Sequence, residues 1–182
     1  MLDLQKIVEH NQEFLKATKD TVAKEELTSK PKRKLAVVSC MDTRLVGMME
    51  DALGYKRGEV IEIKTAGNGV TAPLDNVVQS LLVAHYGMGV TDVLVVGHEN
   101  CGMIDFNATS FIERMVAEGI SKEAIRMIEM GLVEWMDHFC VSEDNVKFTV
   151  DRLRKHPLFP KTVNFYGGMM NPNTGEFTIV EP

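Results

Sequence analysis

The chain has 182 residues, of which 45% are hydrophobic and 25% are charged, and its formal net charge is −6. This length and composition predict one globular domain over residues 1–182 with room for a buried core. The acidic balance argues against a nucleic-acid partner, because phosphates need a basic surplus, and no segment approaches the roughly 18 apolar residues of a membrane helix.

The first predicted element is an amphipathic helix from residue 3 to about residue 18. Its apolar positions recur at helical spacing and share one side with Asn11: Leu4, Ile7, Val8, Phe14 and Leu15. A charged stretch up to Lys34 separates this helix from the rest of the chain. We therefore expect residues 1–28 to form a helical arm that buries its stripe on its own domain or on a second subunit. A homodimer or a dimer-based oligomer is the favoured outcome, because an exposed apolar stripe is a liability in a monomer.

Short apolar runs predict three strands in the first half of the remaining chain, at residues 35–39, 59–63 and 92–97. Residues 45–53 are predicted to form a short helix. A longer helix is expected over residues 71–86, capped by Thr71 and with Pro73 in its first turn. The glycine-containing segment 66–69 is expected to be a loop.

The second half of the chain predicts helices followed by a strand hairpin. The helices are expected at roughly 103–118, 121–139 and 143–155, and the hairpin strands at 163–169 and 176–180. Alternating buried strands and helices indicate an α/β fold with a central, mainly parallel β-sheet flanked by helices. Residues 35–181 would form this core, closed by the hairpin, and the helical arm would precede it.

Three residues with metal-binding side chains follow two of the predicted central strands. Cys40 ends the run that begins at Leu35, and His98 and Cys101 follow the run that ends at Gly97. Ligands of parallel sheets bind beyond the carboxyl ends of the strands, so we expect these side chains to meet at one edge. Two thiols and an imidazole suit Zn²⁺, and three protein ligands leave the fourth coordination position open for chemistry.

A purely structural zinc site remains an alternative. Such a site normally has four protein ligands. The spare candidates are His138 and Cys140, but both fall in the apolar stripe of a predicted helix. Cys140 is therefore interpreted as a small buried hydrophobic residue.

Asp42 and Arg44 lie two and four residues after Cys40. A carboxylate beside zinc can ligate the metal or accept a hydrogen bond from a water, and an arginine can orient that carboxylate through paired hydrogen bonds. Zn²⁺ bound by two thiolates and a neutral histidine forms a site whose net formal charge is zero. Asp42 would act as a fourth ligand in a closed state, and Arg44 would hold it away in an open state. An ordinary surface ion pair is the alternative interpretation.

The motif Cys40-x-Asp42-x-Arg44, followed by His98-x-x-Cys101-Gly102, resembles the β-class carbonic anhydrases, in particular their small bacterial and archaeal branch. The likeness extends over roughly residues 35–181 and includes the segment 66–68, which is similar to the family's glycine loop. One departure is Lys64-Thr65, which stands where the family usually has Arg-Asn. Lysine keeps the charge but lacks the planar fork of arginine.

The resemblance implies zinc-dependent, reversible hydration of carbon dioxide to bicarbonate and a proton. Cys40, His98 and Cys101 would hold Zn²⁺, Asp42 would orient the water that zinc activates, and Arg44 would orient Asp42. The resemblance also implies a homodimer with the active sites near its interface. Because two thiolates donate more charge to zinc than two imidazoles, we expect a weakly acidic water and activity that favours alkaline pH.

Two other functions stay open. Carbonyl sulfide and carbon disulfide hydrolases are similar to this family and keep its zinc ligands, and a non-catalytic zinc sensor would use the same thiols. His85 and Tyr86 end the predicted helix near the third strand, where one of them is a candidate proton relay. Three widely spaced cysteines and a charged N-terminus without an apolar signal region predict a cytoplasmic protein.

Overall fold

The computed structural model describes residues 4–19, 27–136, 139 and 142–180. Its centre is a five-stranded sheet of order β2-β1-β3-β4-β5. The strands are β1 (Leu35–Cys40), β2 (Val60–Thr65), β3 (Asp92–His98), β4 (Asn164–Met170) and β5 (Phe177–Val180). The first four run parallel, and β5 returns antiparallel to β4. The predicted α/β fold, with its mainly parallel sheet and closing hairpin, is confirmed.

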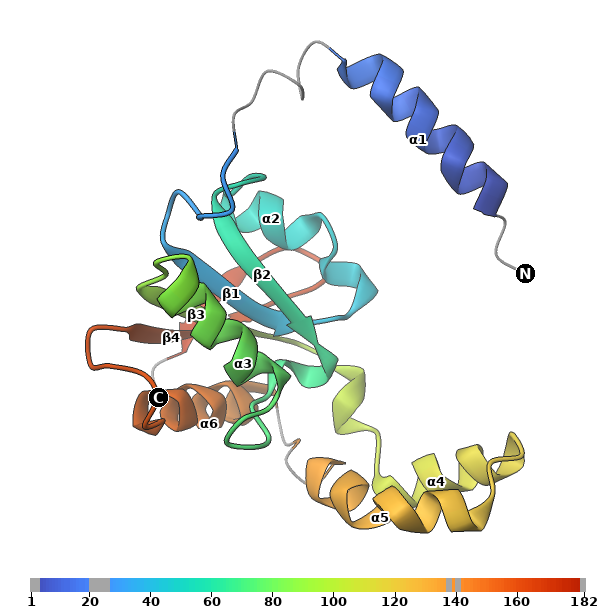
Figure 1. Ribbon diagram of the computed structural model, residues 1–182. Helices are drawn as coiled ribbons and strands as arrows, with labels where there is room; N and C mark the ends of the chain where they lie inside the picture. Colours follow the sequence, from blue (N-terminus) through green and yellow to red (C-terminus); the bar gives the residue numbers. More distant parts are fainter. Residues whose placement is uncertain (1–3, 20–26, 137–138, 140–141, 181–182) are drawn as a thin grey trace.

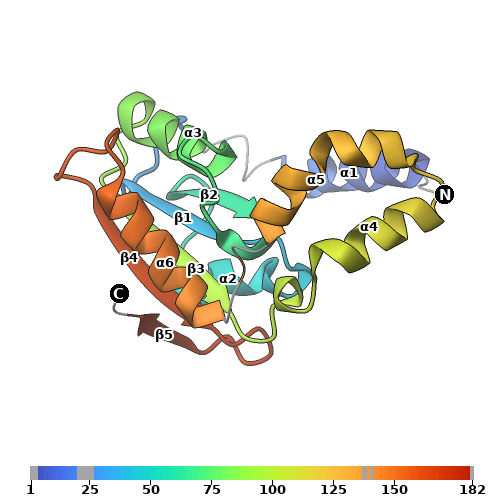
Figure 2. The same ribbon diagram turned by 90° about the horizontal axis from the view of Figure 1, so that it is seen from below.

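Helices cover both faces of this sheet and also extend away from it. They are α1 (Leu4–Thr18), α2 (Met48–Leu53), α3 (Asn76–Leu82), α4 (Ala108–Ala117), α5 (Lys122–Met136) and α6 (Ser142–Lys155). α3 and α6 pack on one face and α2 on the other (Figures 1 and 2). α4 and α5 form a hairpin that projects from the body, and α1 stands apart from it.

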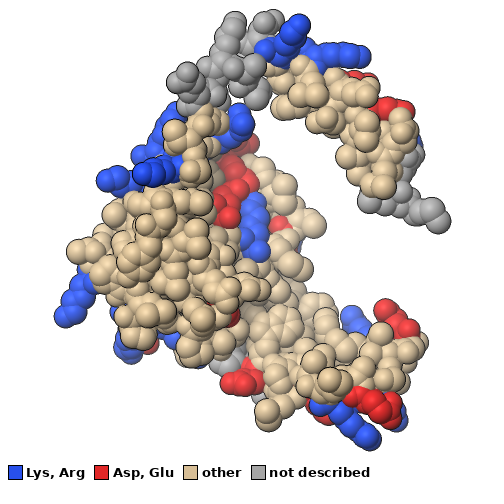
Figure 3. All heavy atoms as spheres, viewed as in Figure 1, with Lys and Arg blue, Asp and Glu red and all other residues tan. Residues whose placement is uncertain are grey.

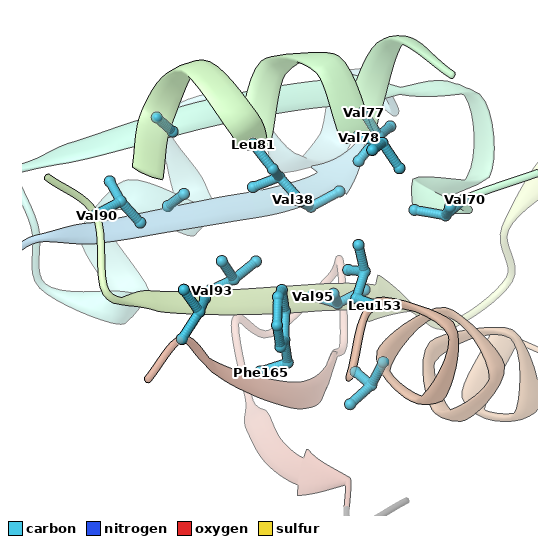
Figure 4. Packing of buried hydrophobic residues seen from close by; sticks show 14 of the residues in the cluster. Val38, Val70, Val77, Val78, Leu81, Val90, Val93, Val95, Leu153 and Phe165 are labelled. Carbon is cyan, nitrogen blue, oxygen red and sulfur yellow. The ribbon is translucent and has the colours of Figure 1, made fainter. Parts of the chain in front are cut away.

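The core has two halves because successive strand residues face opposite sides of the sheet. Val38 of β1 belongs to one cluster with residues of α3 and α6; Figure 4 shows Leu81 of α3 beside it and Leu153 of α6 beside Val95 of the neighbouring strand β3. The preceding residue, Val37, packs with Leu45 and other side chains on the α2 side. All of these residues are fully or almost fully buried. Burial on both faces explains why β1 is a continuous apolar run rather than an alternating one.

The start of α3 differs from the prediction. The helix begins at Asn76, and its cap is Asp75, whose Oδ1 accepts a hydrogen bond from the Val78 N–H at 3.0 Å. The other carboxylate oxygen accepts from the Thr71 N–H at 2.7 Å. Thr71 is therefore not the cap; its backbone N–H donates to the capping residue. Pro73 precedes the helix. Aspartate is the stronger cap here because its two oxygens accept from the N–H groups of Thr71, Ala72 and Val78.

Two other predicted helices are interrupted. Gly47, with φ +77°, separates a 3₁₀ turn at Thr43–Leu45 from α2. A second 3₁₀ turn at Gly102–Ile104 is separated from α4, which Asn107 caps through a hydrogen bond from the Ser110 N–H. In both places a short turn follows the loop that carries a predicted metal ligand, so the chain changes direction there before a regular helix begins.

α1 has the predicted amphipathic pattern, but its apolar side is uncovered. None of its residues is buried, and Leu4 and Leu15 are 65% and 57% exposed. The core of the chain therefore does not bury the apolar stripe of α1. Among the helices that the structure describes, none combines the length and the apolar character needed to cross a membrane.

The capping role of Asp75 is testable. Asp75→Ala should lower the free energy of unfolding by about 1 kcal/mol, which corresponds to a decrease of roughly 2–4 °C in Tm for a chain of this size. Thr71→Ala is the matched control, because Thr71 contributes only its backbone N–H to this cap. It should change stability by less than about 0.5 kcal/mol. Thermal unfolding would contradict the assignment if the Thr71 variant were the less stable of the two.

Candidate metal centre and active site

The sheet brings the three predicted ligands together. Cys40 is the last residue of β1, His98 is the last residue of β3, and Cys101 lies three residues further on. The two strands are parallel neighbours, so both ends reach the same edge. One ligand atom from each residue lies within 4.8 Å of the other two, and the two sulfur atoms are 3.9 Å apart. All three side chains are buried.

The ring of His98 is oriented for ligation. Its Nδ1 lies 2.9 Å from the Glu99 carbonyl oxygen, so Nδ1 carries the proton and donates it to that oxygen. Nε2 is then left with a free lone pair. This nitrogen is buried and has no hydrogen-bond partner among the described residues. A backbone hydrogen bond from one ring nitrogen and an unpaired second nitrogen are typical of a histidine that binds a metal.

The two thiols also fit a cation. Hydrogen bonding from the Cys101 thiol lowers the pKa of Cys40 to about 4, although burial opposes this shift. The same hydrogen bond, together with burial, raises the pKa of Cys101. Two thiolates this close repel each other, so the ionisation of both is favoured only when a cation lies between them. Zn²⁺ would stabilise both thiolates, and the donor set is one that it favours.

Asp42 is held by Arg44 through both carboxylate oxygens. Oδ1 accepts from the Arg44 backbone N–H and from Nε, each at 2.9 Å, and Oδ2 accepts from Nη2 at 2.7 Å. These hydrogen bonds lower the pKa of Asp42 to about 2. Oδ2 lies 3.7 Å from His98 Nε2, so the carboxylate borders the ligand cluster. The carboxylate is thus oriented by Arg44 at the border between the ligand cluster and solvent, with Asp42 partly buried and Arg44 exposed.

Arg44 also reaches the loop between the other two ligands, which the sequence did not reveal. Its Nη2 donates to the Asn100 carbonyl oxygen at 2.9 Å. Asn100 has φ +51°, in the left-handed region, where asparagine is among the most tolerant residues with a Cβ. This one guanidinium therefore ties the loop after β1 to the loop after β3. An isolated asparagine between two ligands carries no signal that distinguishes this role.

Cys40 and Cys101 open onto a cavity of about 400 Å³. Its lining includes the two cysteines and the Asp42–Arg44 pair, and three apolar side chains: Met41, Met103 and Phe106. Ala66 contributes from the loop after β2. The cavity thus combines a small polar cluster with apolar walls, an arrangement typical of small-molecule sites.

Other sequence candidates lie elsewhere. Lys64 does not line the cavity; its Nζ is 3.0 Å from Glu50 and 3.7 Å from Glu62. His85 bonds through Nδ1 to the Val90 carbonyl oxygen. Tyr86 donates to the Leu158 carbonyl oxygen. Neither His85 nor Tyr86 lines the cavity, and the proton-relay role stays a prediction. The interpretation of His138 and Cys140 falls outside the described residues.

Comparison with known proteins agrees with this fold and site. The sequence model of the carbonic anhydrase family matches residues 35–177, and the chain belongs to that family. Its sheet and flanking helices are those of the β-class carbonic anhydrases. The resemblance inferred from the motifs, and the reading of the chain as a carbonic anhydrase enzyme, are thereby confirmed.

Three relatives illustrate the range of the family. The crystal structure of β-carbonic anhydrase isoform I from Trichomonas vaginalis is 40% identical, with a TM-score of 0.94, and the match covers 99% of this chain and 98% of that one. The carbonic anhydrase homologue YvdA of Bacillus subtilis is 36% identical over 183 residues, covering 99% of this chain and 92% of that protein. A carbon disulfide hydrolase of Acidithiobacillus thiooxidans is 25% identical over 154 residues, covering 79% and 75%.

Proposed function

We propose that this chain uses Zn²⁺ to hydrate carbon dioxide reversibly to bicarbonate and a proton. The observation that carries the proposal is the cluster of Cys40, His98 and Cys101, whose ligand atoms lie within 4.8 Å of one another beside a carboxylate held by an arginine. These three residues would hold the metal. Bound zinc lowers the pKa of a coordinated water and so supplies the nucleophile, an effect best known from carbonic anhydrases with three histidine ligands.

Asp42 orients the attacking water. Its pKa of about 2 keeps the carboxylate ionised at neutral pH, so it accepts a hydrogen bond from the water and does not donate one. An accepted hydrogen bond leaves a lone pair of the water oxygen free to face the substrate carbon. Asp42 therefore contributes orientation, which is effective because the reacting atoms must be aligned as well as close.

Arg44 keeps Asp42 available for this role. A free carboxylate is a good zinc ligand, and Oδ2 lies only 3.7 Å from the nitrogen that would bind the metal. Both oxygens are instead bound by the Arg44 guanidinium. This arrangement supports the open state, in which the fourth coordination position is left to water. In the closed state, Asp42 would exchange Arg44 for the metal and block that position.

The apolar walls suit a small linear substrate without a net dipole. Met41, Met103 and Phe106 offer such a surface next to the polar cluster, and the product bicarbonate is charged and leaves for water. Carbon disulfide has the same shape and apolar character, and one relative is a carbon disulfide hydrolase. Hydrolysis of carbon disulfide or carbonyl sulfide is therefore the second candidate, and a zinc sensor without turnover is the third.

The first test concerns the metal and the reaction. The purified chain should contain about one zinc per chain and should hydrate carbon dioxide in a stopped-flow pH assay. Cys40→Ser and Cys101→Ser should lose both zinc and activity, because a neutral hydroxyl cannot replace a thiolate ligand. Cys140→Ser is the matched control and should keep both.

The same preparations discriminate between the three candidates. Turnover of carbon disulfide in preference to carbon dioxide would favour the second function, and tightly bound zinc without turnover of either substrate would favour the sensor. Full zinc content in the Cys40 and Cys101 variants would contradict the ligand assignment.

The Asp42–Arg44 pair has its own test. Asp42→Asn and Arg44→Ala should retain zinc but lower kcat by about 10- to 100-fold, because one removes the oriented acceptor and the other frees Asp42 to reach the metal. Arg33→Ala is the control, since Arg33 forms a comparable ion pair with Glu59 away from the cavity. Wild-type turnover in both pair variants would remove the pair from the mechanism.

The pH profile separates the roles further. Wild-type activity should rise between about pH 6.5 and 9 as the nucleophilic water ionises. The pKa of Asp42 is lowered, so this carboxylate is already charged throughout that window and its own titration adds nothing to the rise. A flat profile would contradict the assignment of the nucleophile.

We also propose that residues 35–181 act as the catalytic core and that residues 1–28 act as an arm in a homodimer or dimer-based oligomer. Two apolar surfaces support this: the stripe of α1, and the α5 side chains Met127 and Met130, which are 87% and 84% exposed. The surface is concave between α1 and the α4–α5 hairpin (Figure 3), and a second copy would cover both. A cytoplasmic location remains a prediction from the cysteine content.

Deletion of residues 1–28 should weaken association and lower activity together, although the proposed ligands are untouched. Phe14→Ser/Leu15→Ser should act in the same direction, because it removes apolar area from the stripe. Glu9→Ser/Lys16→Ser, on the polar side of the same helix, is the control. Sedimentation of the intact chain as an active 20.3 kDa monomer at micromolar concentration would refute the arm's role.

A further inference from the structure

A buried asparagine far from the ligands in sequence reaches the loop that lies behind one of them. Asn145, in the first turn of α6, is 5% exposed. Its Nδ2 donates a hydrogen bond to the Gly67 carbonyl oxygen at 2.7 Å, across 78 residues of sequence. This side chain is therefore a fixed link between α6 and the 3₁₀ turn Ala66–Asn68.

That turn lies directly against Cys40. Thr65 pairs with Cys40 in the β1–β2 register, and its carbonyl oxygen accepts from the Met41 N–H at 2.8 Å. Ala66 lines the same cavity as Cys40. Gly67 follows Ala66 in this turn and directs its carbonyl oxygen to Asn145.

The conformation of Gly67 leaves little freedom for this arrangement to change. Its φ is +73°, and a Cβ built on it would lie 2.3 Å from the ring of Phe139. Glycine is required there both by the left-handed backbone and by the close ring. Phe139 covers one side of Gly67, and the hydrogen bond from Asn145 holds its carbonyl group.

We propose that Asn145 is a positioning residue for the metal centre, which holds the turn Ala66–Asn68 against the end of β1 that carries Cys40. A group that fixes the surroundings of a metal ligand strengthens metal binding. Without the Asn145 amide, the Gly67 carbonyl would be a buried acceptor with no donor. The turn would then rotate to recover a hydrogen bond, and the cavity wall beside Cys40 would move with it. This role rests on the proposed zinc ligands.

The test compares Asn145→Leu with Thr149→Val. Leucine has a similar volume but no donor. Thr149 lies one turn further along α6, is fully buried, and its hydroxyl has no hydrogen-bond partner within the described residues. Its substitution therefore alters the same helix without touching the turn. For each protein, Zn²⁺ affinity is measured by competition with a chromophoric chelator, and the sulfur-to-cobalt charge-transfer absorption is recorded after substitution with Co²⁺.

Asn145→Leu should bind Zn²⁺ about 10- to 100-fold more weakly and should shift the cobalt absorption, because that absorption reports the thiolate's surroundings. Thr149→Val should match the wild type in both measurements. If Asn145→Leu does not fold, Asn145→Ala replaces it, and the water admitted beside Gly67 should give a smaller change in the same direction.

Wild-type affinity and spectrum in the folded Asn145 variant would overturn the inference alone. Equal losses in the Asn145 and Thr149 variants would also overturn it, because they would indicate a packing effect of α6. Absence of zinc binding by the wild-type chain would instead overturn the proposed function together with this inference.

Discussion

The parallel pairing of β1 with β3 is the constraint on which the rest of the centre depends. Leu35 pairs with Asp92 and Ser39 with Val96, so the two strands end at nearly the same level. Cys40 follows Ser39 directly, and His98 lies two residues beyond Val96. Parallel strands need a long crossover, which explains why residues adjacent in space are separated by almost sixty positions in sequence. A one-residue slip would turn one ligand away from the other.

Charge at this edge then determines what the site can bind. Two thiolates whose sulfur atoms are 3.9 Å apart repel each other, and Asp42 adds a further negative group beside them. Arg44 is engaged by both oxygens of Asp42. The negative charge of the two thiolates is therefore left uncompensated in the space between Cys40, His98 and Cys101. A divalent cation with a preference for sulfur and nitrogen would compensate that charge, and it would leave Asp42 with Arg44.

The sequence was sufficient for the sheet and for the cluster of candidate ligands. Buried strands such as β1 are recognisable from their continuous apolar runs. Because ligands of parallel sheets bind beyond the carboxyl ends of the strands, Cys40 and His98 are then expected to lie together. Asn100 and Asn145 were not found, because each acts through one contact with a residue distant in sequence, and an asparagine has many ordinary uses. The start of α3 was misplaced because Thr71 and Asp75 are both good caps. Only the three-dimensional path of the turn favours the aspartate.

The substitution of Lys64-Thr65 for the family's usual Arg-Asn can be understood in these terms. Lys64 points to Glu50 and Glu62, so its charge is satisfied outside the cavity. Thr65 supports Cys40 through its backbone carbonyl, which accepts from Met41, and any residue type can provide that contact. Gly67, in contrast, is held by a side-chain hydrogen bond and a close aromatic ring, and no residue with a Cβ fits there. The loop therefore tolerates change at the positions that act through the backbone or outside the cavity. It is constrained at Gly67, where the left-handed backbone and the packing against Phe139 both exclude a side chain.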